Sequence, residues 1–182
     1  MKRMLAAALS FVLLASTVQA ADNPVVVMET SLGTIKIELN AEKAPITVKN
    51  FLSYVDDKFY DGTVFHRVIA NFMIQGGGFR PGMKEKETRD PIKNESGNGL
   101  SNTRGTIAMA RTRALNSATS QFYINVVDNS EKLDKPRYCV FGNVIAGMDV
   151  VDKIKAVETG PRGGHGDVPL QDVVIKSVRL AK

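Results

Sequence analysis

The sequence predicts a mainly β fold, specifically a closed eight-stranded antiparallel β-barrel capped by two α-helices. Eight short β-prone runs follow one another along the 182 residues. Only two segments carry the apolar spacing of a helix, and glycine, asparagine and proline separate the runs. Closure leaves no unpaired edge strand, so we favour a barrel, with a sandwich as the alternative.

The first twenty residues have the features of a secretory signal peptide. Lys2 and Arg3 precede an apolar run from Met4 to Leu14, and Val18-Gln19-Ala20 resembles a signal-peptidase site. The run is shorter than the roughly 20 residues that cross a bilayer, so no membrane span is expected. We therefore predict a signal peptide over residues 1–20, cleaved after Ala20, and a single domain over residues 21–182.

Charge and cysteine content narrow the function classes further. Without Lys2 and Arg3, the mature chain has 22 Lys and Arg against 19 Asp and Glu, a formal charge of +3. Basic and acidic residues are interspersed, which argues against a nucleic-acid partner. The single cysteine, Cys139, cannot form an internal disulfide and is expected in the core.

The chain begins with a predicted hairpin and a helix. Residues 25–30 and 34–39 form the hairpin strands, joined by a three-residue loop, Ser31 to Gly33. Pro45 suits the first position of a helix. The apolar residues that follow have helical spacing: Val48, Phe51, Leu52 and Val55.

The rest of the chain supplies six strands and the second helix. Strands are predicted over residues 64–69, 71–76, 105–110, 122–127, 139–144 and 172–180, and the helix over residues 147–157. The segment Gly76–Gly105 is long for a structureless connection. It either lines a groove or is a solvated insertion, and composition does not decide between them.

Several common kinds of catalytic site lack their residues here. The chain has only two histidines, His66 and His165, and no cysteine pair, so neither a metal site nor a cofactor is expected. A serine nucleophile needs a neighbouring base, and the sequence indicates no histidine near Ser117 or Ser120. The three glycines Gly76 to Gly78 lack the lysine of a phosphate-binding loop and are interpreted as turn residues.

The stretch FHRVIANFMIQGGG, Phe65 to Gly78, places polar side chains among apolar ones. Strand alternation predicts Phe65 and Arg67 on one face of the first run, with His66 opposite as a structural residue. It puts Met73 and Gln75 together on one face of the second run. Such a set suits an uncharged peptide, but a rim arginine and a structural glutamine explain it equally well.

The same stretch resembles the signature of the cyclophilins, which are peptidyl-prolyl cis-trans isomerases. The resemblance continues in GTIAMAR, SQFYIN and LDKPRYCVFGNVIAGMDVVDKI, and it spans residues 25–180 in order. It implies the eight-stranded barrel with two capping helices and a peptide groove on its outer face. Among cyclophilins the chain is most similar to bacterial periplasmic members, which implies a periplasmic protein that assists the folding of exported chains.

The resemblance also implies which residues form the groove. The catalytic set falls on Arg67, Phe72 and Gln75. The substrate-binding positions fall on Met73, Ala110, Arg111, Gln121, Tyr123, Leu133 and Tyr138. Tyr123 and Tyr138 replace the phenylalanine and histidine of many members, and neither change is expected to abolish activity.

One further departure concerns a drug. Lys132 stands where cyclosporin-sensitive members have a tryptophan that donates to cyclosporin, so weak cyclosporin binding is expected.

The implied partners are proline-containing unfolded or partly folded chains, and a monomer is expected. Three hypotheses follow: an isomerase, a chaperone that binds peptides in the groove without significant turnover, and a barrel that binds small ligands inside. The last is weakest because small barrels fill their interiors with side chains.

Overall fold

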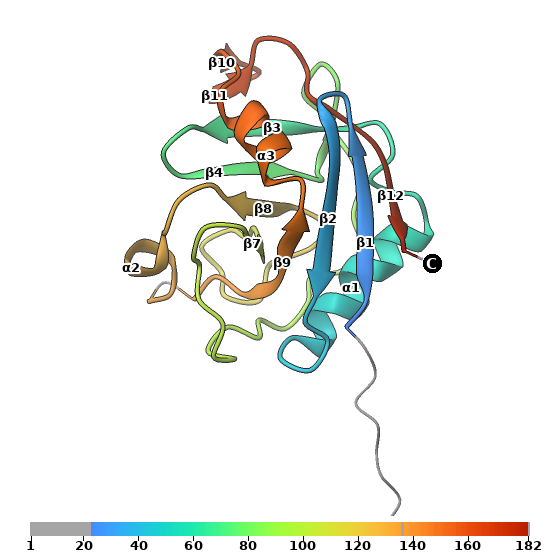
Figure 1. Ribbon diagram of the computed structural model, residues 1–182, viewed down its shortest axis with the longest axis vertical. Coiled ribbons are helices and arrows are strands. Elements are labelled where there is room, and N and C mark those ends of the chain that lie inside the picture. Colours follow the sequence, from blue (N-terminus) through green and yellow to red (C-terminus); the bar gives the residue numbers. More distant parts are fainter. Residues whose placement is uncertain (1–22, 136, 182) are drawn as a thin grey trace, which may run out of the picture.

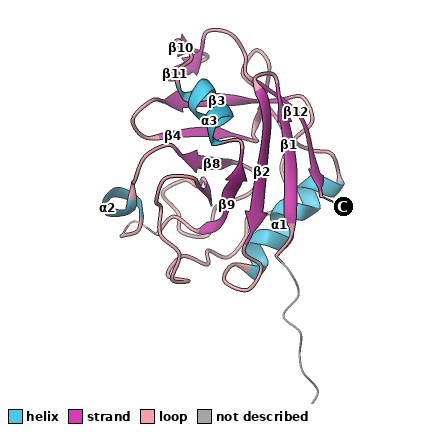
Figure 2. Ribbon diagram, viewed as in Figure 1, coloured by secondary structure: helices cyan, strands magenta, loops and turns pink. Residues whose placement is uncertain are grey.

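Eight strands of the described chain form one closed antiparallel barrel (Figures 1 and 2), which confirms the predicted fold class. The computed structural model of the protein describes residues 23–135 and 137–181, so the predicted signal peptide lies outside it. Around the barrel the strands are β1 (Val25–Thr30), β12 (Val174–Leu180), β3 (Thr63–Ile69), β4 (Met73–Gly76), β8 (Phe122–Asn125), β7 (Thr106–Met109), β9 (Val140–Ala146) and β2 (Gly33–Leu39).

Two helices correspond to the predicted ones. Figure 1 shows α1 (Pro45–Asp56) and α3 (Met148–Lys155) toward opposite ends of β1 and β2. In α1 the buried positions include Tyr54, which was not predicted, whereas Leu52 is only half-buried. The expected number of two is too low, because the described chain also has a four-residue helix, α2 (Ser130–Leu133), too short to show an apolar period.

Side chains fill the barrel interior. Phe51 of α1 packs among three rings, with centroids 5.1 Å from Tyr60, 5.8 Å from Phe122 and 5.3 Å from Phe141. All four residues are fully buried. Val151 and Ile154 of α3 belong to the same apolar cluster. The ends of the barrel are therefore closed by helix side chains that continue its core.

The first hairpin is tighter than expected. Thr30 pairs with Gly33, so only Ser31 and Leu32 form the loop, and the prediction of a three-residue loop is wrong. Gly33 has a φ of +137°, and a Cβ there would come within 2.7 Å of Val150 of α3. Glycine is required at this position because the backbone conformation and the neighbouring helix both exclude a side chain.

Two small hairpins stand outside the barrel. One pairs β5 (Phe79–Arg80) with β6 (Lys84–Glu85), and the other pairs β10 (Thr159–Arg162) with β11 (His165–Pro169). We expected His165 to lie in a loop, but it begins β11. The composition of this segment, rich in glycine and proline, concealed a strand whose partner is only four residues long.

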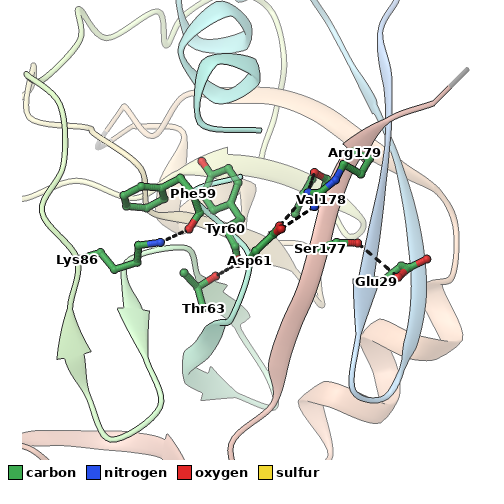
Figure 3. Close-up of polar contacts among 9 residues, drawn as sticks. All are labelled: Glu29, Phe59, Tyr60, Asp61, Thr63, Lys86, Ser177, Val178 and Arg179. Atoms are coloured by element: carbon green, nitrogen blue, oxygen red, sulfur yellow. Dashed lines mark hydrogen bonds and ion pairs between the residues drawn. The ribbon is translucent and has the colours of Figure 1, made fainter. Parts of the chain in front are cut away.

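Polar contacts hold the turn after α1 against the barrel. Figure 3 shows the carboxylate of Asp61 facing the guanidinium of Arg179 on β12. The two nitrogen–oxygen distances are 2.8 and 2.6 Å, and these hydrogen bonds lower the pKa of Asp61. On the other side of the turn, Lys86 donates to the carbonyl of Phe59 and lies over its ring. The turn is thereby fixed from both sides.

Cys139 is buried in the core cluster, as predicted. Burial raises the pKa of its thiol, and the hydroxyl of Thr47 lies 3.6 Å from the sulfur.

In the part of the chain that the structure describes, none of the helices has the length and apolar character to cross a membrane.

Candidate functional site

A β-bulge in β3 sets the direction of Arg67. Phe65 pairs with Gly76 of β4, whereas Arg67 pairs with the very next residue, Gln75. Phe65 and Val68 both belong to the interior cluster, so Arg67 lies on the outer side of the sheet. The prediction that Phe65 and Arg67 share a face is wrong, because the extra residue breaks the two-residue alternation.

The outer sides of the neighbouring strands form a second apolar cluster. Met73 of β4, Ala108 of β7, Tyr123 of β8, Leu133 of α2 and Val140 of β9 are all buried together there. Ile74, Phe122 and Ile124, which alternate with them, face the interior cluster instead. Each strand therefore supplies one set of side chains to the core and another to the outer face.

The structure brings nine of the ten predicted site residues around one cavity of about 110 Å³. They are Arg67, Phe72, Met73, Gln75, Ala110, Arg111, Tyr123, Leu133 and Tyr138. The tenth, Gln121, lines an adjoining hollow of about 320 Å³, to which Gln75, Ala110 and Arg111 also contribute. Glu85 lines this second hollow, so the long segment after Gly76 borders it.

One wall of the cavity is aromatic. The rings of Tyr123 and Tyr138 are 6.1 Å apart and nearly perpendicular. The guanidinium of Arg111 lies over the Tyr138 ring, 4.5 Å from its centroid. Such a contact between a cation and an aromatic face is favourable and orients both side chains.

A network of buried asparagines supports the cavity from behind, and sequence reasoning missed it. The Tyr123 hydroxyl donates to Oδ1 of Asn102 at 2.7 Å, and Nδ2 of Asn125 donates to the same oxygen at 3.2 Å. Asn129 donates through Nδ2 to the carbonyl of Phe72 at 2.7 Å. An asparagine at the end of the apolar run FYIN was the one available signal.

Asp134, one residue after the cavity residue Leu133, anchors this network. Its Oδ1 accepts from the backbone amide of Asn102 at 2.9 Å and from Asn102 Nδ2 at 2.8 Å. The pKa of Asp134 is lowered, because these hydrogen bonds and one from Ser101 outweigh its partial desolvation. The tyrosine hydroxyl at the cavity thus has a fixed acceptor.

The hairpin formed by β10 and β11 places a carboxylate beside Arg67. Oδ2 of Asp167 on β11 lies 3.6 Å from Nε of Arg67. Both side chains are about half exposed, so the ion pair adds little stability. Its position matters more, because an anion beside Nε leaves the two terminal nitrogens for another acceptor.

His66 packs against the small hairpin formed by β5 and β6. Its ring centroid is 4.5 Å from that of Phe79, which is 5.7 Å from the ring of His165. Burial lowers the pKa of His66 to about 4, and the nearby His165 acts in the same direction. His66 is thus neutral at physiological pH and buried, as a structural residue would be.

The arrangement offers a permanent cation, two amides and an apolar floor. Among the described residues, no three His, Cys, Asp or Glu side chains lie close enough together to hold a metal ion. These groups together suit a ligand that combines an apolar ring with hydrogen-bonding groups.

Comparisons with known proteins agree with this geometry. The family model described as cyclophilin type peptidyl-prolyl cis-trans isomerase/CLD matches residues 25–180. Peptidyl-prolyl cis-trans isomerase B of Escherichia coli (strain K12) is 59% identical over 163 residues, covering 86% of this chain and 99% of the relative. Peptidyl-prolyl cis-trans isomerase A of Dickeya dadantii is 49% identical over 187 residues, covering 100% and 98%.

A solved structure shows the same fold. The crystal structure of a Cryptosporidium parvum cyclophilin type peptidyl-prolyl cis-trans isomerase, in the presence of the dipeptide Ala-Pro, superposes with a TM-score of 0.77. Its sequence is 26% identical, and the match covers 87% of this chain and 99% of that one.

Proposed function

The chain belongs to the cyclophilin-type peptidyl-prolyl cis-trans isomerases, and we propose that it performs this isomerisation in the outer cavity, without forming a covalent bond to the substrate. The observation that carries the proposal is the meeting of Arg67 with an apolar floor in a single cavity. A donor beside an apolar pocket is what an X-Pro bond needs in order to twist.

Arg67 is the group that we assign to the transition state. Amide resonance gives the bond a rotation barrier of ~18–20 kcal/mol. As the bond twists, the proline nitrogen regains a lone pair that a guanidinium can hydrogen-bond. The planar ground state presents no such lone pair, so the interaction stabilises the transition state selectively. A preorganised donor of this kind contributes about 3 kcal/mol.

The apolar floor has a different task. Phe72, Met73, Tyr123 and Leu133 would hold the proline ring. Fixing one side of the bond lets the other side rotate, and the apolar surroundings favour the twisted amide, which is less polar than the planar one. Gln75 would bind the peptide backbone beside the ring.

The test compares the mature chain, residues 21–182, with Arg67→Ala and Arg67→Lys. Isomerisation of an X-Pro peptide should fall about 100-fold in Arg67→Ala. Arg67→Lys keeps the charge but loses the planar fork, so it should recover only part of the rate. An Arg67→Ala protein that is folded and retains the full rate would contradict the proposal.

We also propose that the protein acts on exported proteins in the periplasm, as a monomer. The family match begins at residue 25, after the segment that reads as a signal peptide. Fractionation of cells that express the full chain should recover a product lacking residues 1–20 in the periplasm. Recovery of the uncut chain with the cytoplasm would exclude this location.

Cyclosporin should bind weakly. Lys132 is exposed on α2, next to the cavity residue Leu133. A lysine cannot reproduce the contact of an indole ring and its N–H donor. Inhibition should therefore need micromolar or higher cyclosporin, and an inhibition constant in the nanomolar range would show this proposal to be wrong.

A further inference from the structure

The three glycines that follow Gln75 have different neighbours. A Cβ on Gly77 would come within 2.9 Å of the Phe122 and Tyr60 rings, and this residue has a φ of +84°, so the turn and the core both require glycine. Gly78 does not have a positive φ. The φ at Gly78 therefore does not itself require glycine.

A side chain, not the backbone, excludes larger residues from position 78. A Cβ on Gly78 would lie 2.6 Å from Cγ of Gln121 and 2.7 Å from both Cδ and Nε2. Real Cβ atoms essentially never approach other atoms so closely. Gln121 thus lies flat against the bare backbone of Gly78, in space that any side chain would occupy.

The position of Gln121 matters because its amide holds a predicted groove residue. Oε1 of Gln121 accepts a hydrogen bond from Nε2 of Gln75 at 2.9 Å. The side chain of Gln121 also acts on the pKa of the buried His66, which it raises against the larger effect of burial. Since the Gln75 nitrogen is turned toward Gln121, its oxygen remains as an acceptor for a peptide amide.

We propose that Gly78 is a positioning residue for the isomerase groove. Its missing side chain allows Gln121 to lie across the backbone and to fix the orientation of the Gln75 amide. The inference rests on the proposed function of the outer cavity. It assigns the last glycine of the run a role in substrate alignment that a turn residue would not have.

Gly78→Ala should separate activity from stability. The nearest atoms to the added methyl group all belong to the side chain of Gln121, which can rotate away without a shift of the backbone. Once Gln121 has moved, Gln75 loses its partner and its fixed orientation. Activity on an X-Pro peptide should fall about five- to tenfold, as for the loss of one hydrogen bond, while the urea midpoint stays close to that of the wild type.

A double-mutant cycle tests the route of the effect. Gly78→Ala and Gln121→Ala should each lower kcat/KM, and the double variant should be no worse than Gln121→Ala, because the added methyl then has nothing to displace. A Gly78→Ala variant with wild-type activity would overturn the proposal. So would a double variant whose loss is the product of the two single losses.

Gly160→Ala is the matched control. Gly160 also lacks a positive φ, and its Cβ would come within 2.9 Å of Leu170, an exposed side chain that does not line the groove. Gly160 pairs with Val168, next to Asp167, so the control is measured in an Asp167→Asn background, where activity should be the same with and without Gly160→Ala. A loss equal to that of Gly78→Ala would show that crowding a glycine anywhere lowers activity, and it would overturn the assignment.

Two further comparisons separate a failure of the Gly78 role from a folding defect and from a failure of the proposed site. If Gly78→Ala does not fold, the double variant should fold again, because Gln121 is what the methyl meets; a double variant that stays unfolded overturns the proposal. Arg67→Ala is measured in parallel. Full activity in Arg67→Ala rejects the proposed site itself, whereas loss there with none in Gly78→Ala rejects only the role of Gly78.

Discussion

The barrel interior and the apolar cluster on its outer face share strands that send alternate side chains to each. The two regions differ in how completely side chains fill them. Inside, the rings of Phe51, Tyr60, Phe122 and Phe141 pack against one another and are fully buried. Outside, Met73 and Tyr123 border a cavity together with Arg67. The interior is filled to specify the fold, whereas the outer cluster keeps space for a ligand beside a cation.

The difference shows how one sheet separates stability from function. A strand residue that faces inward is surrounded by other strands and helices, so its loss leaves a void. An outward residue at the cavity already borders open space, so its loss creates less. Substitutions in the interior should therefore lower mainly the stability, whereas substitutions at the cavity should lower mainly the turnover.

The largest expected contrast is between the same substitution in the two regions. Phe51→Ala should lower the free energy of unfolding by about 3–5 kcal/mol, because it opens a cavity among three rings. Its effect on turnover per folded molecule should be small. Phe72→Ala should lower the stability less, by under about 1.5 kcal/mol. It should lower kcat/KM at least roughly tenfold, as expected when substrate alignment is lost.

Urea unfolding and X-Pro peptide assays on both variants check this contrast. Phe72 is only partly buried, so it is the appropriate partner for the fully buried Phe51. If both variants lost stability and turnover in the same proportion, the two regions would form a single cooperative unit, and the separation argued above would be wrong.

Much of this separation was predictable from sequence, and the parts that were not have physical reasons. The eight strands and the two longer helices follow from apolar periodicity. The gathering of Arg67, Phe72 and Gln75 followed from the family motif, while periodicity alone left their role open. The bulge between Phe65 and Arg67 was not predictable, since alternation assumes unbroken pairing.

Other features depend on contacts between distant segments. The hairpin formed by Thr159–Arg162 and His165–Pro169 has a loop-like composition. Asn102 lies in the long segment after Gly76, about 20 residues from its partner Tyr123. Neither periodicity nor a local motif marks such residues, because their role appears only when the barrel closes.

His66 of β3 belongs to neither cluster but is buried, and it should make stability depend on pH. Burial lowers its pKa to about 4, against 6.5 in an unfolded chain. Between these values the unfolded state binds a proton that the folded state does not. Stability should therefore fall as pH decreases from 6.5 to 4, by about 3 kcal/mol in total.

Urea midpoints at pH 7, 5.5 and 4.5, compared with those of His66→Gln, measure this term. Arg67 and His165 are the charged or titratable groups that act on His66, and both remain in the variant. The variant also keeps every carboxylate, so the difference in slope between the two proteins from pH 7 to 4.5 reports His66, and the slope should be smaller in His66→Gln. An equal slope in both proteins would mean that His66 takes up its proton as readily when folded.

Tyr123 of the outer cluster has two roles, since its ring lines the cavity and its hydroxyl reaches the asparagine network. Tyr123→Phe leaves Oδ1 of Asn102 with Asn125 Nδ2, at 3.2 Å, as its remaining side-chain donor. The free energy of unfolding should fall by about 1–2 kcal/mol, because a buried acceptor loses its shorter hydrogen bond. Turnover should change by less than about threefold, since the ring that holds proline remains.

Thermal or urea unfolding combined with peptide assays checks this expectation. Tyr138→Phe is the control, because the ring of Tyr138 also lines the cavity but is only half-buried. Equal destabilisation by the two variants would show that the asparagine network does not depend on the Tyr123 hydroxyl.

The smallest expected effect concerns the ion pair between Arg67 and Asp167. Asp167→Asn should change the free energy of unfolding by less than about 0.5 kcal/mol, because both side chains are about half exposed. It should lower kcat/KM about two- to fivefold, since an unpinned guanidinium samples more orientations. Asp167→Glu should restore part of the activity, and the loss should vanish in an Arg67→Ala background.

Asp172→Asn provides a matched comparison, because Asp172 pairs with Arg162 of β10 at 2.7 Å, and neither residue lines the cavity. That ion pair is shorter than the one at Arg67, so a purely structural effect would be larger in Asp172→Asn. An activity loss confined to Asp167→Asn would place a residue of the outer hairpin in the alignment of Arg67. Equal losses in the two variants would show that the hairpin acts only through its general stability, and that the outer region is less separate from the fold than its geometry implies.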